Sequence, residues 1–254
     1  MTTLTAEGVS VSFGGVHALV DVDLEVPEGA LVGLIGPNGA GKTTFIDAIT
    51  GFVRSRGRVE LAGRDLSRLA PHQRARSGLA RTWQAGELFD DLTVAENLAV
   101  ATDHQSIWAA ATEVLWKARP NGAAAREALA LVGLDAAAGK LPAQLSQGER
   151  KLAGVARALA AQPRVVCLDE PAAGLDSAES EQLGRRLRQV VDAGTGVLLV
   201  DHDMSLVLSV CDRIVVLEFG KVIATGSPDE VRRDRRVVEA YLGSAGAERV
   251  AEQL

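Results

Sequence analysis

The stretch Gly36-Pro37-Asn38-Gly39-Ala40-Gly41-Lys42-Thr43-Thr44 decides how this chain folds, because it matches the phosphate-loop pattern G-x-x-x-x-G-K-[ST]. It lies between an apolar, strand-like run at 31–35 and a stretch of helical character at 42–50, which is the context that the pattern requires. Its glycines let successive backbone N–H groups point at phosphate oxygens, and the helix start adds positive potential there. We expect Lys42 to reach the β- and γ-phosphates and the Thr43 hydroxyl to ligate Mg²⁺. The loop alone does not separate kinases, GTPases and transport ATPases.

The sequence around this loop predicts an α/β fold. In the first 63 residues, strand-like runs occur at 4–13, 22–26, 31–35 and 58–61, and Gly51 stands where a helix C-cap belongs. From about 71 to 160, helix-favouring residues dominate, so we expect that region to be largely helical.

The second half of the chain predicts a parallel sheet. Apolar, β-branched runs at 165–168 and 197–200 flank an amphipathic stretch at 177–193, and strand, helix, strand implies a parallel sheet covered on both faces. A hairpin at 214–224 should follow, and then short helices starting at Pro228 and Arg235.

Three polar side chains follow the predicted strands of this sheet. Asp169 and Glu170 end one strand and His202 follows the next, so all three should lie at the carboxyl edge where α/β folds bind ligands. We expect Asp169 to be the partner of Mg²⁺, directly or through a water, and Glu170 to polarise the water that attacks the γ-phosphate. We expect His202 to contact the γ-phosphate. Alone, each of these would be an ordinary strand end or structural histidine, and Gln84 by itself would be a surface amide.

The bulk composition limits the partners and the compartment. With 33 acidic and 27 basic side chains the formal net charge is −6, which makes nucleic acid an unfavourable partner. The start lacks a secretory-signal pattern, and no apolar run reaches the roughly 18 residues of a membrane span. We therefore expect a soluble cytoplasmic chain that relies on another chain to span any membrane. Cys167 and Cys211 are expected to be reduced packing residues.

The order of these motifs, with Leu145-Ser146-Gln147-Gly148-Glu149 and Gly174-Leu175-Asp176 between them, resembles the nucleotide-binding subunits of ABC transporters over about residues 4–243. The resemblance implies a P-loop NTPase ABC cassette with a RecA-like core, an N-terminal antiparallel β subdomain and an inserted α-helical subdomain at about 86–160. The ATP-binding domain would span residues 1–243, and 244–254 would form a C-terminal tail.

The resemblance also implies roles that the residues alone do not give. Phe13 would pack against adenine, and Gln84 would be a Mg²⁺ ligand and a catalytic sensor, linking Mg²⁺ and the γ-phosphate to the membrane subunit. Asp176 would reach across a head-to-tail dimer. Lys42, Gln84, Glu170 and His202 would then form the catalytic set.

The stretch at 145–149, here called the LSQGE stretch, corresponds to the family's LSGGQ, which caps the γ-phosphate of ATP bound to the opposite subunit. Ser146 and Gly148 are retained, whereas Gln147 and Glu149 depart from that pattern. Ser146 with Glu149 also has the spacing of a helix capping box, and both readings can hold together. Glu149 would place a carboxylate near a triphosphate, so weaker contacts across the dimer are expected unless it turns away.

Three further stretches, at 11–29, 79–101 and 200–231 together with 237–243, are similar to the ATPase subunits of branched-chain and other hydrophobic amino-acid importers. This likeness implies MgATP, transmembrane permeases, a second identical or different ATP-binding subunit and an extracytoplasmic substrate-binding protein. The chain would lie on the inner face of the membrane. The alternatives are the ATPase of another transporter, such as a lipid or lipopolysaccharide exporter, and a soluble ABC protein. Leu88, Phe89, Leu92 and Val94 would line a permease groove or belong to the helical core.

Overall fold

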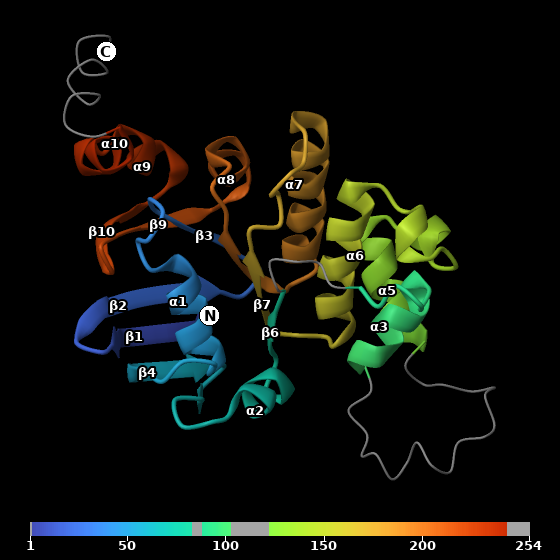
Figure 1. Ribbon diagram of the computed structural model, residues 1–254, viewed down its shortest axis with the longest axis horizontal. Coiled ribbons are helices and arrows are strands. Elements are labelled where there is room, and N and C mark those ends of the chain that lie inside the picture. The colour runs from blue at the N-terminus through green and yellow to red at the C-terminus, as the bar shows by residue number, and fades with distance from the viewer. Residues whose placement is uncertain (1, 83–87, 103–121, 243–254) are drawn as a thin grey trace.

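A six-stranded sheet forms the centre of the computed structural model, which describes residues 2–82, 88–102 and 122–242 (Figure 1). The strand order is β10-β9-β3-β8-β7-β6, parallel except for the antiparallel pair β9–β10. The strands are β3 (Leu31–Ile35), β6 (Leu79–Arg81), β7 (Val165–Asp169), β8 (Gly196–Val200), β9 (Arg213–Glu218) and β10 (Lys221–Gly226). Every residue of β3, β7 and β8 is buried, which explains why these strands read as continuous apolar runs.

Helices cover this sheet and lead away from its strands. They are α1 (Lys42–Thr50), α7 (Ser177–Asp192), α8 (Met204–Val210), α9 (Pro228–Arg233) and α10 (Arg235–Leu242). Gly51 ends α1 in the left-handed conformation at φ 87°, as predicted for its C-cap.

A second, antiparallel sheet has the strand order β2-β1-β4-β5. Its strands are β1 (Thr2–Phe13), β2 (Val16–Pro27), β4 (Arg56–Leu61) and β5 (Arg64–Asp65). Phe45, Ile46 and Ile49 of α1 are fully buried in the hydrophobic cluster that this sheet shares with the central sheet. The antiparallel β subdomain is therefore confirmed, and α1 is packed into its core.

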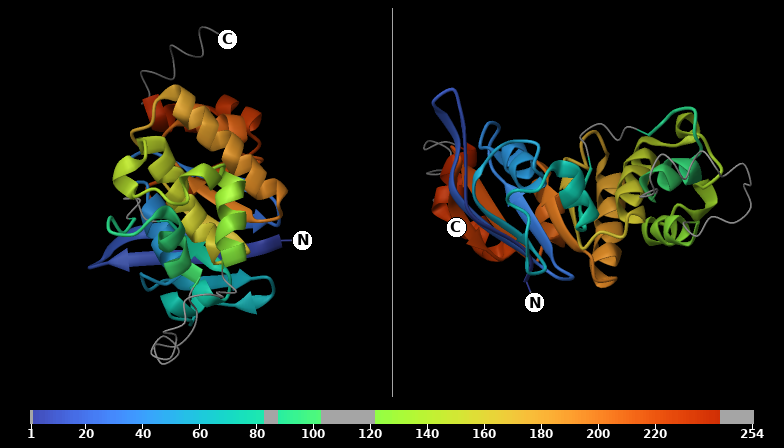
Figure 2. Two further views of the ribbon diagram at one scale, coloured as in Figure 1. Left: turned by 90° about the vertical axis from the view of Figure 1, so that its right-hand side faces the viewer. Right: turned by 90° about the horizontal axis from the view of Figure 1, so that it is seen from below.

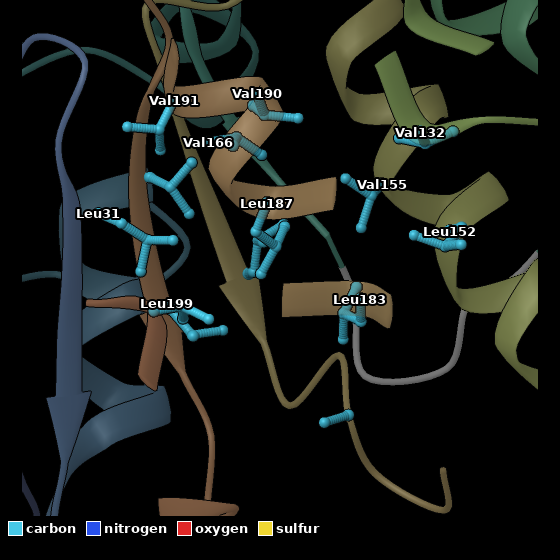
Figure 3. Packing of buried hydrophobic residues seen from close by; sticks show 14 of the residues in the cluster. Leu31, Val132, Leu152, Val155, Val166, Leu183, Leu187, Val190, Val191 and Leu199 are labelled. Carbon is cyan, nitrogen blue, oxygen red and sulfur yellow. The ribbon is translucent and has the colours of Figure 1, made fainter. Parts of the chain in front are cut away.

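The helical lobe consists of α3 (Val94–Thr102), α5 (Gly122–Val132) and α6 (Gln147–Ala160), with short 3-10 turns at Asp135–Ala137 and Pro142–Gln144. It lies to one side of the sheets in Figure 1 and in the right-hand view of Figure 2. Figure 3 shows how it is joined to them: Leu187 and Val190 of α7 lie between Leu199 of the sheet and Val155 of α6. One continuous core thus connects the lobe to the sheet.

Two elements differ from the sequence-based expectation. Within the region predicted to be largely helical, Leu79–Arg81 forms strand β6, because pairing with 165–167 of β7 outweighs local helix propensity. Helix α2 (Pro71–Arg76) does precede it. Helix α8 was not expected; it forms because the Asp203 side chain accepts a hydrogen bond from the Leu206 N–H and caps its start.

Both cysteines are buried, as predicted for packing residues. Burial raises the pKa of Cys167 and of Cys211 to about 12, so neither thiol carries a reactive thiolate at neutral pH. No helix in the described ranges is long and apolar enough to cross a membrane.

Candidate functional site

The predicted catalytic segments meet at one edge of the central sheet. Strands β3, β8 and β7 are neighbours and parallel, and Val200 at the end of β8 pairs with both Leu34 and Asp169. The phosphate loop (residues 36–44) leaves β3, Glu170 follows β7, and His202 follows β8. The topology therefore confirms that these segments share a carboxyl edge, as the sequence predicted.

At two positions of the phosphate loop, the backbone fits only glycine. Gly36 has φ 151°, and a Cβ atom there would lie 2.1 Å from the carbonyl oxygen of Leu217. Gly41 caps α1 at φ 105°, where a Cβ atom would lie 2.8 Å from the carbonyl oxygen of Ala18. Both glycines let the loop approach neighbouring backbone closely, so that α1 begins directly at Lys42.

Lys42 folds back over this loop. Its Nζ donates to the carbonyl oxygens of Gly36 at 2.7 Å and Pro37 at 3.1 Å. Burial lowers the pKa of Lys42, and the nearby negative charges of Glu170 and Asp169 oppose that shift. The lysine and the two acids thus share one electrostatic site, into which a triphosphate would bring further negative charge.

Asp169 is almost fully buried, with 1% of its surface exposed. Its Oδ2 accepts a hydrogen bond from Arg81 at 3.2 Å, and its Oδ1 has no hydrogen-bond partner among the described residues. Burial raises the pKa of Asp169, while Arg81 acts in the opposite direction. A buried carboxylate oxygen without a partner is costly, and a cation or its water would satisfy it. A Mg²⁺ ion would fit on this side of the carboxylate. Thr43, the second ligand that the sequence predicts, is exposed at the first turn of α1.

Glu170 starts the connection out of β7 in an unusual conformation. It has φ 50°, a region that costs energy for a non-glycine residue, and its N–H donates to the carbonyl oxygen of Val200 at 2.7 Å. This bond holds the backbone of Glu170 against the end of β8, beside the segment that carries His202.

His202 is largely exposed at the same edge, with 63% of its side chain accessible. Its Nδ1 lies 3.7 Å from Oδ1 of the buried Asp201. Asp201 also accepts hydrogen bonds from the N–H groups of Ala172 at 2.9 Å and Asp203 at 3.0 Å. It therefore ties the His202 segment to the segment after Glu170. The sequence patterns do not single out Asp201, although an acid directly between a buried strand and a histidine is a usable signal.

The LSQGE stretch begins α6 as a capping box. The Ser146 side chain accepts from the Glu149 N–H at 3.1 Å, and the Glu149 carboxylate accepts from the Ser146 N–H at 2.8 Å. Lys140 Nζ lies 3.6 Å from the other Glu149 oxygen. The capping box is thus confirmed, and Glu149 turns back onto its own helix and a lysine.

The start of α6 packs closely against the start of α7 and the loop before it. A Cβ atom at Gly174 would lie 2.4 Å from Nε2 of Gln147, and one at Gly148 would lie 3.1 Å from a carboxylate oxygen of Glu179. Gln147, which replaces a glycine of the usual pattern, therefore lies against Gly174 of its own chain.

The remaining predicted residues have distinct environments. Phe13 is 51% exposed at the end of β1, as a side chain that stacks on a base would be. Asp176 is exposed and caps α7 by accepting from the Glu179 N–H at 2.8 Å. Gln84 lies outside the described residues.

Tyr241 of α10 contacts the first residue of the phosphate loop, which no sequence pattern indicates. Burial raises its pKa to about 12, and a hydrogen bond with the backbone of Gly36 acts in the opposite direction. The last described helix is thus in contact with the loop, although some 200 residues separate them in the chain.

The fold and the site define a nucleotide-binding P-loop ATPase with an inserted helical lobe. The family model of the ABC transporter matches residues 19–173, and the chain belongs to that family: it binds ATP and hydrolyses it to power a transporter. A second model, of the branched-chain amino acid ATP-binding cassette transporter, matches 221–247.

Individual relatives agree with this assignment along nearly the whole chain. The high-affinity branched-chain amino acid transport ATP-binding protein LivG of Salmonella typhimurium is 39% identical over 251 residues, covering 95% of this chain and 98% of LivG. The lipopolysaccharide export system ATP-binding protein LptB of Haemophilus influenzae is 37% identical, covering 96% and 98%. Among solved structures, the ADP conformation of MJ1267, an ATP-binding cassette of an ABC transporter, superposes with a TM-score of 0.84 at 29% identity, covering 96% of this chain and 100% of MJ1267.

Proposed function

We propose that this chain powers the import of branched-chain or other hydrophobic amino acids, as one of two ATP-binding subunits on the cytoplasmic face of a permease. The observation that carries the substrate class is the match of residues 221–247 to the branched-chain amino acid cassette model. The similarity to LivG over 95% of the chain supports it. An extracytoplasmic substrate-binding protein would deliver the amino acid.

In this proposal the site binds one ATP per subunit. The N–H groups of the phosphate loop and Lys42 hold the phosphates, and Phe13 packs against adenine. Thr43, Asp169 and Gln84 hold Mg²⁺, which neutralises charge on the phosphates when it is bound. Glu170 takes a proton from the attacking water, and His202 contacts the γ-phosphate.

A second subunit would complete each site. Its Ser146 and Gly148 would face the γ-phosphate, with Gln147 and Glu149 beside them and Asp176 reaching across. The N-terminus of α6 suits this role because its first N–H groups and the helix dipole favour an anion. Closure of the two subunits over ATP would then drive the permease.

A groove between the two lobes is the proposed permease contact. It has a volume of about 210 Å³, and small side chains from α2, α3 and α6 line much of it, including Ala75, Ala101 and Ala158. Close by in sequence, Phe89 is 52% exposed, whereas Val94 is fully buried and Leu88 packs on the core. The four apolar residues that the sequence suggested for a permease contact, Leu88, Phe89, Leu92 and Val94, are not among the described residues that line this groove. Val94 belongs to the core, and Phe89 is exposed and available to a partner.

Replacement of Glu149 by glutamine should strengthen ATP-dependent dimerisation. Glutamine keeps the capping box but removes a carboxylate charge from the surface that meets the partner's triphosphate. Because this carboxylate is one-third exposed and lies near Lys140, the gain should be modest, roughly twofold to fivefold in the dimer dissociation constant. Sedimentation in the presence of ATP measures this dissociation constant. Both chains compared carry Glu170→Gln, so that bound ATP persists. A weaker dimer would show that Glu149 contributes favourably to the contact.

The substrate assignment is tested by uptake in the native host. Deletion of the gene should abolish high-affinity uptake of labelled leucine, isoleucine and valine, and wild-type chain supplied from a plasmid should restore it. The Glu170→Gln chain is the matched control and should not restore uptake. Unchanged amino-acid uptake together with defective lipopolysaccharide at the cell surface would contradict the proposal. That result would favour lipopolysaccharide export, the function given in the name of LptB.

A further inference from the structure

Arg81 lies at the junction of three elements that surround the proposed Mg²⁺ position. It is the last residue of β6, and its side chain is only 7% exposed. Its guanidinium forms ion pairs with Asp47 on α1, the helix that starts at Lys42, and with Asp169 at the end of β7. The Phe52 ring lies against the same guanidinium, 5.9 Å from its centroid to Cζ.

Thr82, the residue after Arg81, forms hydrogen bonds with the end of β7. The Thr82 N–H donates to the carbonyl oxygen of Cys167 at 2.9 Å, and its hydroxyl accepts from the Asp169 N–H at 3.4 Å. The end of β6 therefore holds Asp169 through both its backbone and its carboxylate. In sequence, this strand end leads directly to the segment that contains Gln84.

The two oxygens of Asp169 are not equivalent. Arg81 binds Oδ2 at 3.2 Å, whereas Oδ1 is buried without a hydrogen-bond partner among the described residues. A carboxylate can rotate about its last bond, and a planar guanidinium anchored at a second point by Asp47 prevents this rotation. The result is a carboxylate with one oxygen fixed by the protein and the other left for a ligand.

We propose that Arg81 is a positioning residue that orients the Asp169 carboxylate toward the Mg²⁺ of the bound nucleotide. This inference rests on the proposed function, which assigns Asp169 to Mg²⁺. It explains why a cation is buried beside an intended cation ligand, where it would otherwise reduce the attraction of Asp169 for a metal. Orientation outweighs that loss because a metal ligand held in place by a hydrogen-bonded neighbour binds far more tightly than a mobile one.

The test is calorimetric titration of ADP with and without Mg²⁺, which reads binding rather than turnover. In wild-type protein, Mg²⁺ should increase ADP affinity. In Arg81→Gln, we expect this Mg²⁺ enhancement to fall by about tenfold or more, with ADP affinity in EDTA unchanged within about twofold. Arg81→Lys keeps the positive charge but lacks the planar guanidinium, which can bind two carboxylates at once in a fixed geometry, so it should lose only part of the Mg²⁺ enhancement.

Two control variants separate the explanations. Asp47→Asn weakens the second anchor of the Arg81 guanidinium, so it should lose part of the Mg²⁺ enhancement but less than Arg81→Gln loses, because the contact with Asp169 remains. Asp169→Asn should lose the enhancement, and Arg81→Gln added to it should cause no further loss. Thermal unfolding of each variant monitors the fold, and if Arg81→Gln does not fold, a full Mg²⁺ enhancement in Arg81→Lys overturns the inference.

The outcomes distinguish this inference from the function on which it rests. If Asp169→Asn loses the Mg²⁺ enhancement and Arg81→Gln keeps it, Arg81 does not orient the carboxylate and the inference is wrong. If Asp169→Asn keeps the Mg²⁺ enhancement, Asp169 is not a Mg²⁺ ligand, and the proposed function of the site is wrong whatever the result for Arg81. If Arg81→Gln weakens ADP binding equally with Mg²⁺ and in EDTA, Arg81 only supports the fold.

Discussion

Replacement of Glu170 by glutamine should abolish ATP turnover while ATP binding remains intact. Burial lowers the pKa of Lys42 and raises that of Asp169, and the charge of the Glu170 carboxylate acts to raise both, so these groups share one electrostatic site. The Glu170 N–H donates to the carbonyl oxygen of Val200 at the end of β8 at 2.7 Å. Glutamine has nearly the same shape but cannot accept a proton, so the water loses its base. Removal of a general base costs on the order of 10²–10⁴ in rate. We therefore expect hydrolysis to fall by at least about 100-fold with ATP affinity nearly unchanged.

Steady-state phosphate release and equilibrium binding of a fluorescent ATP analogue measure the two effects. Glu181→Gln is a matched control, since Glu181 is an exposed carboxylate on α7 that pairs with Arg185, and it should hydrolyse ATP normally. Normal turnover by Glu170→Gln would refute the assigned role of Glu170.

Replacement of Lys42 by alanine should remove nucleotide binding itself. Lys42 is a buried cation of the site, with 8% of its surface exposed, and the negative charges of Glu170 and Asp169 act on it. Without it, the phosphates would lose a charge-assisted contact, and less positive charge would remain to balance Glu170 and Asp169. Loss of such a contact in a buried site is worth about 3 kcal/mol or more, which corresponds to at least roughly 100-fold in affinity.

The same fluorescent analogue measures this loss, and Lys221→Ala on β10 serves as the control because that residue is exposed. An unchanged affinity in Lys42→Ala would count against the phosphate-loop assignment. Lys42 also hydrogen bonds to the loop carbonyls, so a thermal melt of the variant without nucleotide separates a misfolded loop from lost phosphate contact.

Local patterns predict the parts of the fold whose signals lie within a few residues. Strands β3, β7 and β8, helix α1 and its Gly51 cap, and the capping box of α6 occur where the sequence places them. Each depends on short-range chemistry: a buried apolar run, a left-handed glycine, or a serine three residues before a glutamate. Burial of β3 on both faces makes its pattern especially clear.

Tertiary contacts set the parts that the sequence does not reveal. Strand β6 exists only because it pairs with β7, and the roles of Arg81, Asp201 and Tyr241 come from partners far along the chain. The orientation of Glu149 is only partly predictable from the sequence. The spacing of Ser146 and Glu149 predicts the capping box, but it does not predict that Lys140 lies close to Glu149. The shared sheet edge followed from strand direction alone, whereas the contacts within the site required the fold.

We propose that the ATP site formed by the phosphate loop, Asp169 and Glu170 is half of a site that a second subunit completes. Sedimentation equilibrium of the Glu170→Gln chain, with and without ATP, tests it most directly, because bound ATP then persists. We predict the 26.6 kDa monomer without ATP and twice that mass with ATP, and the monomer in both conditions when Ser146→Arg is added. A Glu170→Gln chain that binds ATP yet remains a monomer at all concentrations would contradict the claim.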